Sequence, residues 1–351
     1  MKPLALPQAI RFPKALEKGD RIAVTAPSSG VEQKWHRRLD YVLQYWRDLG
    51  FEIIEGVCLR GNHKHVSASA KDRAAELMHF LTDSDISAII PPWGGELAID
   101  LLERLDFGAI ACLPPKWIVG YSDTSTLLVA MTSMTGWATL HGANMMDSDA
   151  LEGEMNEKNY RMLTTKEQWV TQYSSAWYAN NWCNWSDNPS ERLTLNQKTE
   201  IKSINWCIGQ AISGRMIGGC LDTLMPIADT CFFDSVAFRA NFAEKEGIIL
   251  YLENCELSPC ALVRALYGLK YRGFFDHIDG LLLGRSAADV IRDESKMNYD
   301  EAVVYVLSAL KIPVLYDVDI GHKPPQMSIV NGARSIVEFD GSVMKLKQQF
   351  D

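Results

Sequence analysis

The sequence predicts an α/β protein whose first half contains a parallel β-sheet with helices on both faces. Two observations lead to this prediction. Short apolar runs typical of buried strands alternate with segments of helical periodicity between residues 20 and 135, and the connections are short. This alternation stops near residue 150, and a different pattern begins at residue 209. A chain of 351 residues is long enough for two domains.

In the first half, each predicted strand is an apolar run that ends in a turn of small or polar residues. The strands cover residues 20–27, 51–57, 87–91 and 116–120, and the helices cover 32–49, 70–83, 96–106 and 123–135. Apolar residues recur every three to four positions in the first of these helices. Ligands of parallel sheets bind beyond the carboxyl ends of the strands. We therefore expect a site near the turns at Ser28, Gly94 and Ser122.

Residues 165–206 are polar and show no regular periodicity, yet they contain five of the ten tryptophans: Trp169, Trp177, Trp182, Trp185 and Trp206. Disordered linkers are poor in aromatic residues. We therefore expect this segment to be folded against the rest of the protein.

From residue 209 the sequence predicts a second domain with glycine-rich turns. Apolar runs predict strands at 248–252, 280–283 and 313–317, helical patterns cover 258–270 and 298–310, and alternation marks 334–339. The predicted organisation is an N-terminal domain, a tryptophan-rich connector and a C-terminal domain, at residues 1–160, 161–208 and 209–351.

Composition limits the classes of function. The formal net charge of −9 disfavours binding to nucleic-acid polymers, which requires a basic surface, but is compatible with a small nucleotide ligand. We see neither an apolar run long enough for a signal peptide nor one long enough for a membrane span. The eight cysteines form no Cys-x-x-Cys pair and no Cys/His cluster with zinc spacing, so we expect reduced thiols, a cytoplasmic location and no metal.

The sharpest local feature is the segment KWIVGYSDTST at 116–126, where an apolar strand runs through Gly120 into Ser122 and then a helix. A serine at such a turn exposes its hydroxyl beside free backbone N–H groups at the start of the helix, an arrangement that suits a nucleophile. The alternative is a helix-capping cluster, since serine, aspartate and threonine are favoured at helix starts.

A serine nucleophile needs a base and a carboxylate that orients it. Among seven histidines, His322 lies in a constrained Gly-His-Lys-Pro-Pro loop and His141 could face the end of the sheet. Glu253 ends the apolar run 248–252, where a carboxylate is costly unless it is paired. An exposed loop histidine and a helix-entry acid are the alternatives. The turn at Gly94 and Gly95 could hold an anion or be a plain tight turn, and it lacks a nucleotide-binding fingerprint.

Together these segments resemble the LD-carboxypeptidase-like serine peptidase family. The resemblance covers nearly the whole chain and rests on the order and spacing of several motifs: GDRIAVTAPSS near the start, AIIPPWGGE at 88–96, KWIVGYSDTSTLL at 116–128, LHGAN at 140–144, GRMIGGCLDTL at 214–224, ILYLENCE at 249–256, GLLLGRS at 280–286 and PVLYDVDIGHKPPQMSIVNGA at 313–333.

The resemblance implies a catalytic triad of Ser122, Glu253 and His322, with Ser122 in the first domain and the acid and base in the second. The backbone N–H groups of Asp123 and Gly95 would form the oxyanion hole. It further implies a flavodoxin-like N-terminal domain, a β-barrel-type α/β C-terminal domain, a cleft between them, no cofactor, and a homodimer.

The connector is similar to that of the microcin C immunity branch, in which a tryptophan stacks on the adenine of an aminoacyl nucleotide. Trp185 is the best match and Trp182 the second, although Asn184 stands where that branch often has aspartate. Packing of the connector is the alternative role. The resemblance implies a hydrolase of peptidyl- or aminoacyl-nucleotides; the alternatives are a murein tetrapeptide LD-carboxypeptidase and a non-catalytic binder of small molecules.

Overall fold

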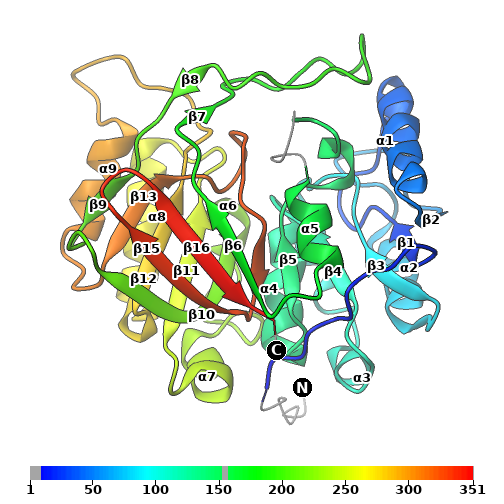
Figure 1. The fold of residues 1–351 in the computed structure, drawn as a ribbon, viewed down its shortest axis with the longest axis horizontal. Coiled ribbons are helices and arrows are strands. Elements are labelled where there is room, and N and C mark those ends of the chain that lie inside the picture. Colours follow the sequence, from blue (N-terminus) through cyan, green and yellow to red (C-terminus); the bar gives the residue numbers. More distant parts are fainter. Residues whose placement is uncertain (1–8, 152–156, 351) are drawn as a thin grey trace.

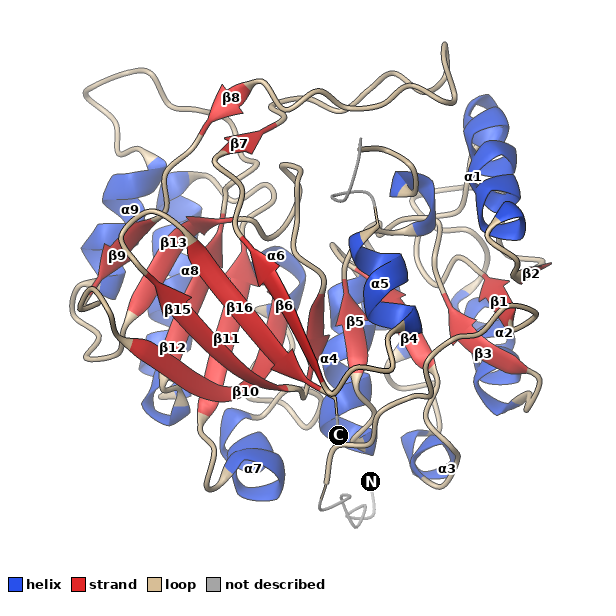
Figure 2. Ribbon diagram, viewed as in Figure 1, coloured by secondary structure: helices blue, strands red, loops and turns tan. Residues whose placement is uncertain are grey.

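The computed structural model describes residues 9–151 and 157–350 and has the two-domain α/β fold that the sequence predicts (Figure 1). Two separate sheets lie side by side, one built mainly from the first third of the chain and one mainly from the last half. The middle part of the connector runs along the top of the view, from the C-terminal sheet towards α1 (Figure 2).

The N-terminal sheet has six strands in the order β14-β5-β4-β3-β1-β2. Within this sheet, β1 to β5 are parallel to one another. Strand β14 comes from the last part of the chain and pairs antiparallel with β5. The strands are β1 (Arg21–Val24), β2 (Glu52–Glu55), β3 (Ile86–Ile89), β4 (Trp117–Gly120), β5 (Thr139–His141) and β14 (Ile329–Asn331).

Helices cover both faces of this sheet, as expected for parallel strands. One face packs on α1 and α5, and the other on α2, α3 and α4. The helices are α1 (His36–Asp48), α2 (Ala70–Thr82), α3 (Phe107–Ala111), α4 (Thr124–Thr135) and α5 (Lys158–Thr164), with 3₁₀ turns η1 (Gln33–Trp35), η2 (Ala98–Leu101) and η3 (Met145–Asp147).

The C-terminal sheet has eight strands in the order β6-β16-β15-β10-β11-β12-β13-β9. Strands β10 to β13 are parallel to one another, and the outer strands are antiparallel. The strands are β6 (Trp169–Tyr173), β9 (Lys202–Ile204), β10 (Ala211–Cys220), β11 (Ile248–Glu253), β12 (Gly280–Gly284), β13 (Val314–Val318), β15 (Arg334–Phe339) and β16 (Met344–Gln349).

The helices of this half pack on one face of the sheet, in an apolar core that continues into α4 of the N-terminal half. A shared core of this kind fixes the two halves relative to each other. The helical segments are α6 (Leu221–Leu224), α7 (Ser235–Phe238), a π-helical turn η5 (Arg239–Ala243), α8 (Pro259–Tyr271), the 3₁₀ turn η6 (Phe274–His277) and α9 (Tyr299–Leu307).

The connector contains more regular structure than its sequence indicates. Its first and last strands, β6 and β9, form the two ends of the C-terminal sheet, and a short hairpin of β7 (Trp177–Tyr178) and β8 (Gln197–Lys198) lies between them. The loop between β7 and β8 extends towards α1 of the N-terminal half (Figure 1). Among the described helices, none is both long and apolar enough to cross a membrane.

The helix expected over 96–106 is wrong, because only the 3₁₀ turn η2 forms there. Tertiary partners take the backbone groups that a helix would use: the Arg73 guanidinium donates to the Leu97 carbonyl at 2.9 Å, and the Asp123 carboxylate accepts from the Ala98 N–H at 2.7 Å. These contacts hold the segment beside the turn that carries Ser122.

Candidate active site

Ser122 lies at the turn between β4 and α4. Its backbone φ is +61°, a left-handed conformation that is strained for a serine, and Gly120 has a φ of +148°. This is the sharp strand-to-helix turn that presents a side chain at the carboxyl edge of a sheet. In the described part of the chain, no residue forms a hydrogen bond with the Ser122 hydroxyl, and the side chain is half-buried.

The glycine turn after β3 faces this serine. A Cβ atom added to Gly94 would lie 2.7 Å from the Ser122 Cβ atom and 2.9 Å from both the Ser122 Oγ atom and the Asp123 nitrogen. The N–H groups of Asp123 and Gly95 donate no hydrogen bond to any described residue. Unused donors next to a serine hydroxyl are what an oxyanion hole requires.

A buried network fixes both turns. The Asp123 carboxylate accepts hydrogen bonds from the Ser28 hydroxyl at 2.6 Å and from the Ala98 N–H at 2.7 Å. Burial raises the pKa of Asp123, although both hydrogen bonds oppose this effect. The Ser28 Oγ atom in turn accepts from the Leu97 N–H at 3.2 Å. The side chain of Asp123 thus ties the turn of Ser122 to the loop of Gly95, and within the described residues the N–H groups of Asp123 and Gly95 have no acceptor.

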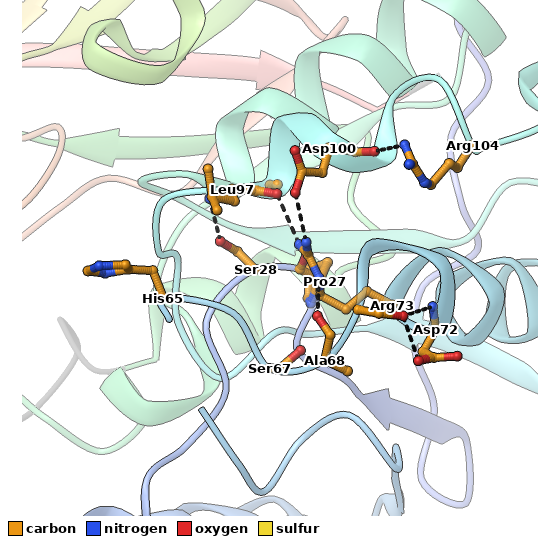
Figure 3. Close-up of polar contacts among 12 residues, drawn as sticks. Pro27, Ser28, His65, Ser67, Ala68, Asp72, Arg73, Leu97, Asp100 and Arg104 are labelled. Atoms are coloured by element: carbon orange, nitrogen blue, oxygen red, sulfur yellow. Dashed lines mark hydrogen bonds and ion pairs between the residues drawn. The ribbon is translucent and has the colours of Figure 1, made fainter. Parts of the chain in front are cut away.

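Arg73 of α2 joins the loop after β1 to the loop after β3 (Figure 3). Its guanidinium is buried and donates to the carbonyl oxygens of Pro27 and Leu97 at 2.7 and 2.9 Å, and it pairs with Asp100 at 3.1 Å. The loops after β1 and β3 are therefore tied to one rigid helix. Sequence reasoning missed Arg73, because an arginine inside an amphipathic helix carries no local sign of such a role.

His322 and Glu253 form an ion pair in the other half of the molecule. The His322 Nδ1 atom lies 2.9 Å from the Glu253 Oε2 atom, and Glu253 is fully buried at the end of β11. Burial lowers the pKa of His322, but the Glu253 carboxylate and, after it, the Cys255 side chain outweigh burial and hold this pKa well above its ordinary value. Burial alone would raise the pKa of Glu253. The charge of His322 outweighs burial, so the pKa of Glu253 lies below its ordinary value.

Glycine is required where the loop of His322 passes this carboxylate. Gly321 has a φ of +101°, and a Cβ atom there would lie 2.5 Å from the Glu253 Oε2 atom. The close approach places the imidazole next to the buried acid. The Gly-His sequence is thus explained by packing as well as by chemistry.

The two half-sites meet at Tyr121. Its ring lies edge-on to the His322 imidazole with centroids 4.9 Å apart, and Tyr121 directly precedes Ser122. A further link joins the halves behind the serine, where the Cys220 N–H donates to the Ser125 Oγ atom at 3.1 Å. The fold therefore brings the turn of Ser122 and the His322–Glu253 pair together, although they are about 130 to 200 positions apart in the sequence.

A second histidine lies beneath the pair. His141 of β5 is fully buried, packs edge-on against Tyr251 at 5.2 Å, and has no hydrogen-bond partner for either ring nitrogen within the described residues. Burial lowers the pKa of His141 to about 4, so its imidazole is neutral at pH 7. The structure thus leaves His322 as the histidine paired with a carboxylate.

The two connector tryptophans differ in exposure. The indole of Trp185 is only 7% exposed, its N–H donates to the Glu191 carbonyl at 2.8 Å, and the Arg38 guanidinium lies 4.0 Å from its ring centre. Trp182 is 37% exposed, and its N–H donates to the carbonyl of His322 at 3.0 Å. In this conformation, Trp185 packs the connector onto α1, whereas Trp182 presents surface beside the histidine.

Over residues 9–151 and 157–350, no group of three or more histidine, cysteine, aspartate or glutamate side chains is arranged to hold a metal ion.

Comparison with known proteins identifies relatives along almost the whole chain. The family model described as LD-carboxypeptidase N-terminal domain matches residues 22–142, and the model described as LD-carboxypeptidase C-terminal domain matches residues 213–337. The microcin C7 self-immunity protein MccF of Escherichia coli is 26% identical over 340 residues, covering 95% of each chain.

Two further matches differ in the compound that their names give. A protein of Bacillus subtilis named probable murein peptide carboxypeptidase is 24% identical over 327 residues, covering 92% of this chain and 90% of its own. The solved structure of MccF in complex with aspartyl sulfamoyl adenosine has a TM-score of 0.83 at 25% identity and covers 97% of this chain and 98% of its own.

Proposed function

This chain belongs to the LD-carboxypeptidase family of serine peptidases, and we propose that it hydrolyses the amide-type bond of peptidyl- or aminoacyl-nucleotides. The observation that carries the catalytic part is the hydrogen-bonded His322–Glu253 pair, which contacts the turn of Ser122 through Tyr121. A serine with a paired histidine and a buried acid is the set of groups that acyl transfer requires.

In the proposed mechanism, Ser122 attacks the carbonyl carbon of the scissile bond while His322 accepts the proton of its hydroxyl. The Glu253 carboxylate accepts a hydrogen bond from the Nδ1–H of His322 and stabilises the imidazolium that forms. The free N–H groups of Asp123 and Gly95 bind the oxyanion. His322 then protonates the leaving nitrogen, and water, deprotonated by His322, releases the acyl group and restores Ser122.

Three observations support a nucleotide in the leaving group. A relative at 26% identity is a microcin C7 self-immunity protein, and a similar structure at 25% identity holds aspartyl sulfamoyl adenosine. In this chain, the partly exposed indole of Trp182 lies beside His322, and an aromatic face can bind a base with about 1–3 kcal/mol. Trp182 is therefore our first choice for the stacking residue, with Trp185 available only if the connector moves.

A murein tetrapeptide is the second candidate substrate, because the relative named as a murein peptide carboxypeptidase matches almost as well. The test compares wild-type kcat/KM for aspartyl sulfamoyl adenosine and for a murein tetrapeptide ending in D-alanine. Preference for the adenosine compound supports the proposal, and preference for the tetrapeptide replaces it with the second candidate. Tight binding of either compound without turnover would instead support a binding protein. The predicted homodimer is tested by sedimentation.

The pH profile should report the His322–Glu253 pair. Since the base must be neutral, kcat/KM should rise about tenfold per pH unit until pH reaches the pKa of His322 and then level off. The Glu253 carboxylate raises this pKa, so the rising limb should lie well above pH 6.5. Initial rates between pH 5 and 10 measure it. If kcat/KM levels off at or below pH 6.5, His322 is not paired with the Glu253 carboxylate in the working enzyme.

Alanine in place of Gly94 should lower kcat by about 10²-fold or more, because its methyl group would occupy the space between Ser122 and the Asp123 nitrogen. Steady-state kinetics and circular dichroism measure activity and folding together. Gly268→Ala is the matched control, since a Cβ atom at this α8 position meets nothing within 4 Å. Equal activity of both variants would show that the turn at Gly94 does not face the reacting carbonyl.

A further inference from the structure

His141 belongs to a ring of side chains that also contains the His322–Glu253 pair. The Tyr121 ring lies edge-on to the imidazole of His322, with centroids 4.9 Å apart, and to that of His141, with centroids 6.2 Å apart. His141 in turn packs edge-on against Tyr251 at 5.2 Å. Tyr251 and Glu253 are two positions apart on β11, so their side chains project from the same face of this strand. The ring therefore closes at Glu253, and His141 and Glu253 border the same interior.

Two members of this ring carry buried polar atoms that lack a partner. The Glu253 Oε2 atom is paired with His322 at 2.9 Å, whereas the Oε1 atom is buried and forms no hydrogen bond with any described residue. The same holds for both ring nitrogens of His141. Burying such atoms without a hydrogen bond is costly. A neutral imidazole has one N–H to donate and a carboxylate oxygen accepts, so each group can supply what the other lacks.

Both groups are in the protonation state that such a contact needs. Burial lowers the pKa of His141 to about 4, so its imidazole is neutral at pH 7 and has a single N–H. Burial alone would raise the pKa of Glu253, but the charge of His322 is the largest of the effects that outweigh it, so the carboxyl group is ionised. His141 and Glu253 each contribute to the shift in the pKa of the other, which requires them to be close.

The other donors near the Glu253 carboxylate are weaker or are engaged elsewhere. The Tyr251 hydroxyl donates to the Asn331 Oδ1 atom at 2.8 Å. Cys220 lies opposite Glu253 on the neighbouring strand β10, and its thiol interacts with the carboxylate, but a thiol is a weak donor. The Cys220 Sγ atom also lies 3.7 Å from the Asp222 Oδ2 atom, which competes for its proton. An imidazole N–H is the stronger donor available to the Oε1 atom.

We propose that His141 is a positioning residue for the catalytic acid, and that its N–H donates to the Glu253 Oε1 atom, directly or through one water molecule. The inference rests on the proposed hydrolase function and adds a residue to its machinery. With both oxygens bound, the carboxylate is held in one orientation, and it holds the imidazole of His322 in the orientation that attack by Ser122 needs. His141 touches no reacting atom and acts only through Glu253.

The test is a double-mutant cycle on the rate at which a fluorophosphonate labels Ser122. His141→Phe keeps a ring of similar shape and removes the donor, and it should slow labelling by about 10- to 100-fold, the effect of losing a hydrogen bond to a charged group. In the Glu253→Gln background, the same change should slow labelling by less than about threefold, because no oriented carboxylate remains to be disturbed. Equal slowing in both backgrounds, or no slowing in either, would overturn the proposal.

Further variants separate donation from packing. His141→Asn and His141→Gln place an amide N–H near the Nδ1 and Nε2 positions, and at least one of them should label about tenfold faster than His141→Phe. If both are as slow as His141→Phe, packing explains the loss. His277→Phe is the matched control, because η6 precedes β12 and lies at the opposite edge of the sheet, so it should keep the wild-type rate. If Cys220→Ala shows the coupling to Glu253→Gln and His141→Phe does not, the thiol is the donor and the proposal is wrong.

Nuclear magnetic resonance of protein labelled with ¹⁵N-histidine tests the contact without turnover and without a substitution at position 141. The N–H of His141 should give a downfield proton resonance that remains that of a neutral imidazole down to pH 5. This resonance should move upfield in Glu253→Gln and stay in place in Glu256→Gln. If it does so in a protein that cleaves neither candidate substrate, the contact stands although the proposed function has failed. A resonance that Glu253→Gln leaves in place contradicts the contact itself.

Discussion

Ser122→Ala should lower kcat by about 10⁴-fold or more while leaving the fold and substrate binding intact, since loss of a serine nucleophile removes the covalent step. The half-buried hydroxyl bonds no described residue, so its removal leaves no buried partner unsatisfied. Single-turnover kinetics on aspartyl sulfamoyl adenosine and calorimetry of its binding measure the two effects separately.

Ser203→Ala is the control for this change, because Ser203 is exposed on β9, far from the turn in sequence. It should keep wild-type rates. If Ser122→Ala retained more than about a tenth of wild-type kcat, the nucleophile would have to be another group, and Ser122 would revert to a helix-capping residue.

Glu253→Gln should lower kcat by a similar factor, about 10⁴-fold, because a neutral amide cannot stabilise the imidazolium or hold the required tautomer of His322. The rising limb of the pH profile should also move to lower pH, since the charge of the carboxylate is the largest of the effects that raise the pKa of His322. Rates and profiles of wild type and variant, measured on one substrate, report both effects.

The exposed neighbour Glu256 provides the control, because it lies three residues later, in the loop that follows β11, and outside the pair. Glu256→Gln should keep both the rate and the position of the limb. If the rate of Glu253→Gln rises over the same pH range as that of wild type, Glu253 is not the partner of the base.

The local sequence pattern was sufficient for four of the six strands of the N-terminal sheet, but β5 and β14 were not predicted. Short apolar runs ending in polar turns predicted β1 to β4, and helical spacing predicted α1, α2 and α4 to within a few residues. The ten-residue strand β10 was missed, because its glycines were interpreted as turns. Gly218 is needed there for a different reason, since a side chain would collide with the backbone of Tyr251 on the neighbouring strand. Sequence alone cannot distinguish the two uses of glycine.

The residues of the candidate site also divide into those that the local sequence predicts and those that it does not. Ser122 was recognisable because strand, glycine, serine and helix start are adjacent in the chain. His322 and Glu253 were only two candidates among several on local chemistry, and the resemblance to a family selected them. Their 2.9 Å contact depends on two strands and on Gly321, so no local rule could predict it. Arg73 was missed because burial, which gives it its importance, is a property of the tertiary fold.

The account depends most on Ser122, His322 and Glu253 acting as one unit, and covalent labelling with a fluorophosphonate tests this directly. Mass mapping of the labelled wild type should place a single adduct on Ser122, formed at a rate that rises with pH along the same limb as kcat/KM. His322→Ala and Glu253→Gln should slow its formation by orders of magnitude. An adduct on another residue, or equal labelling of Ser122 in His322→Ala, would contradict the proposed triad.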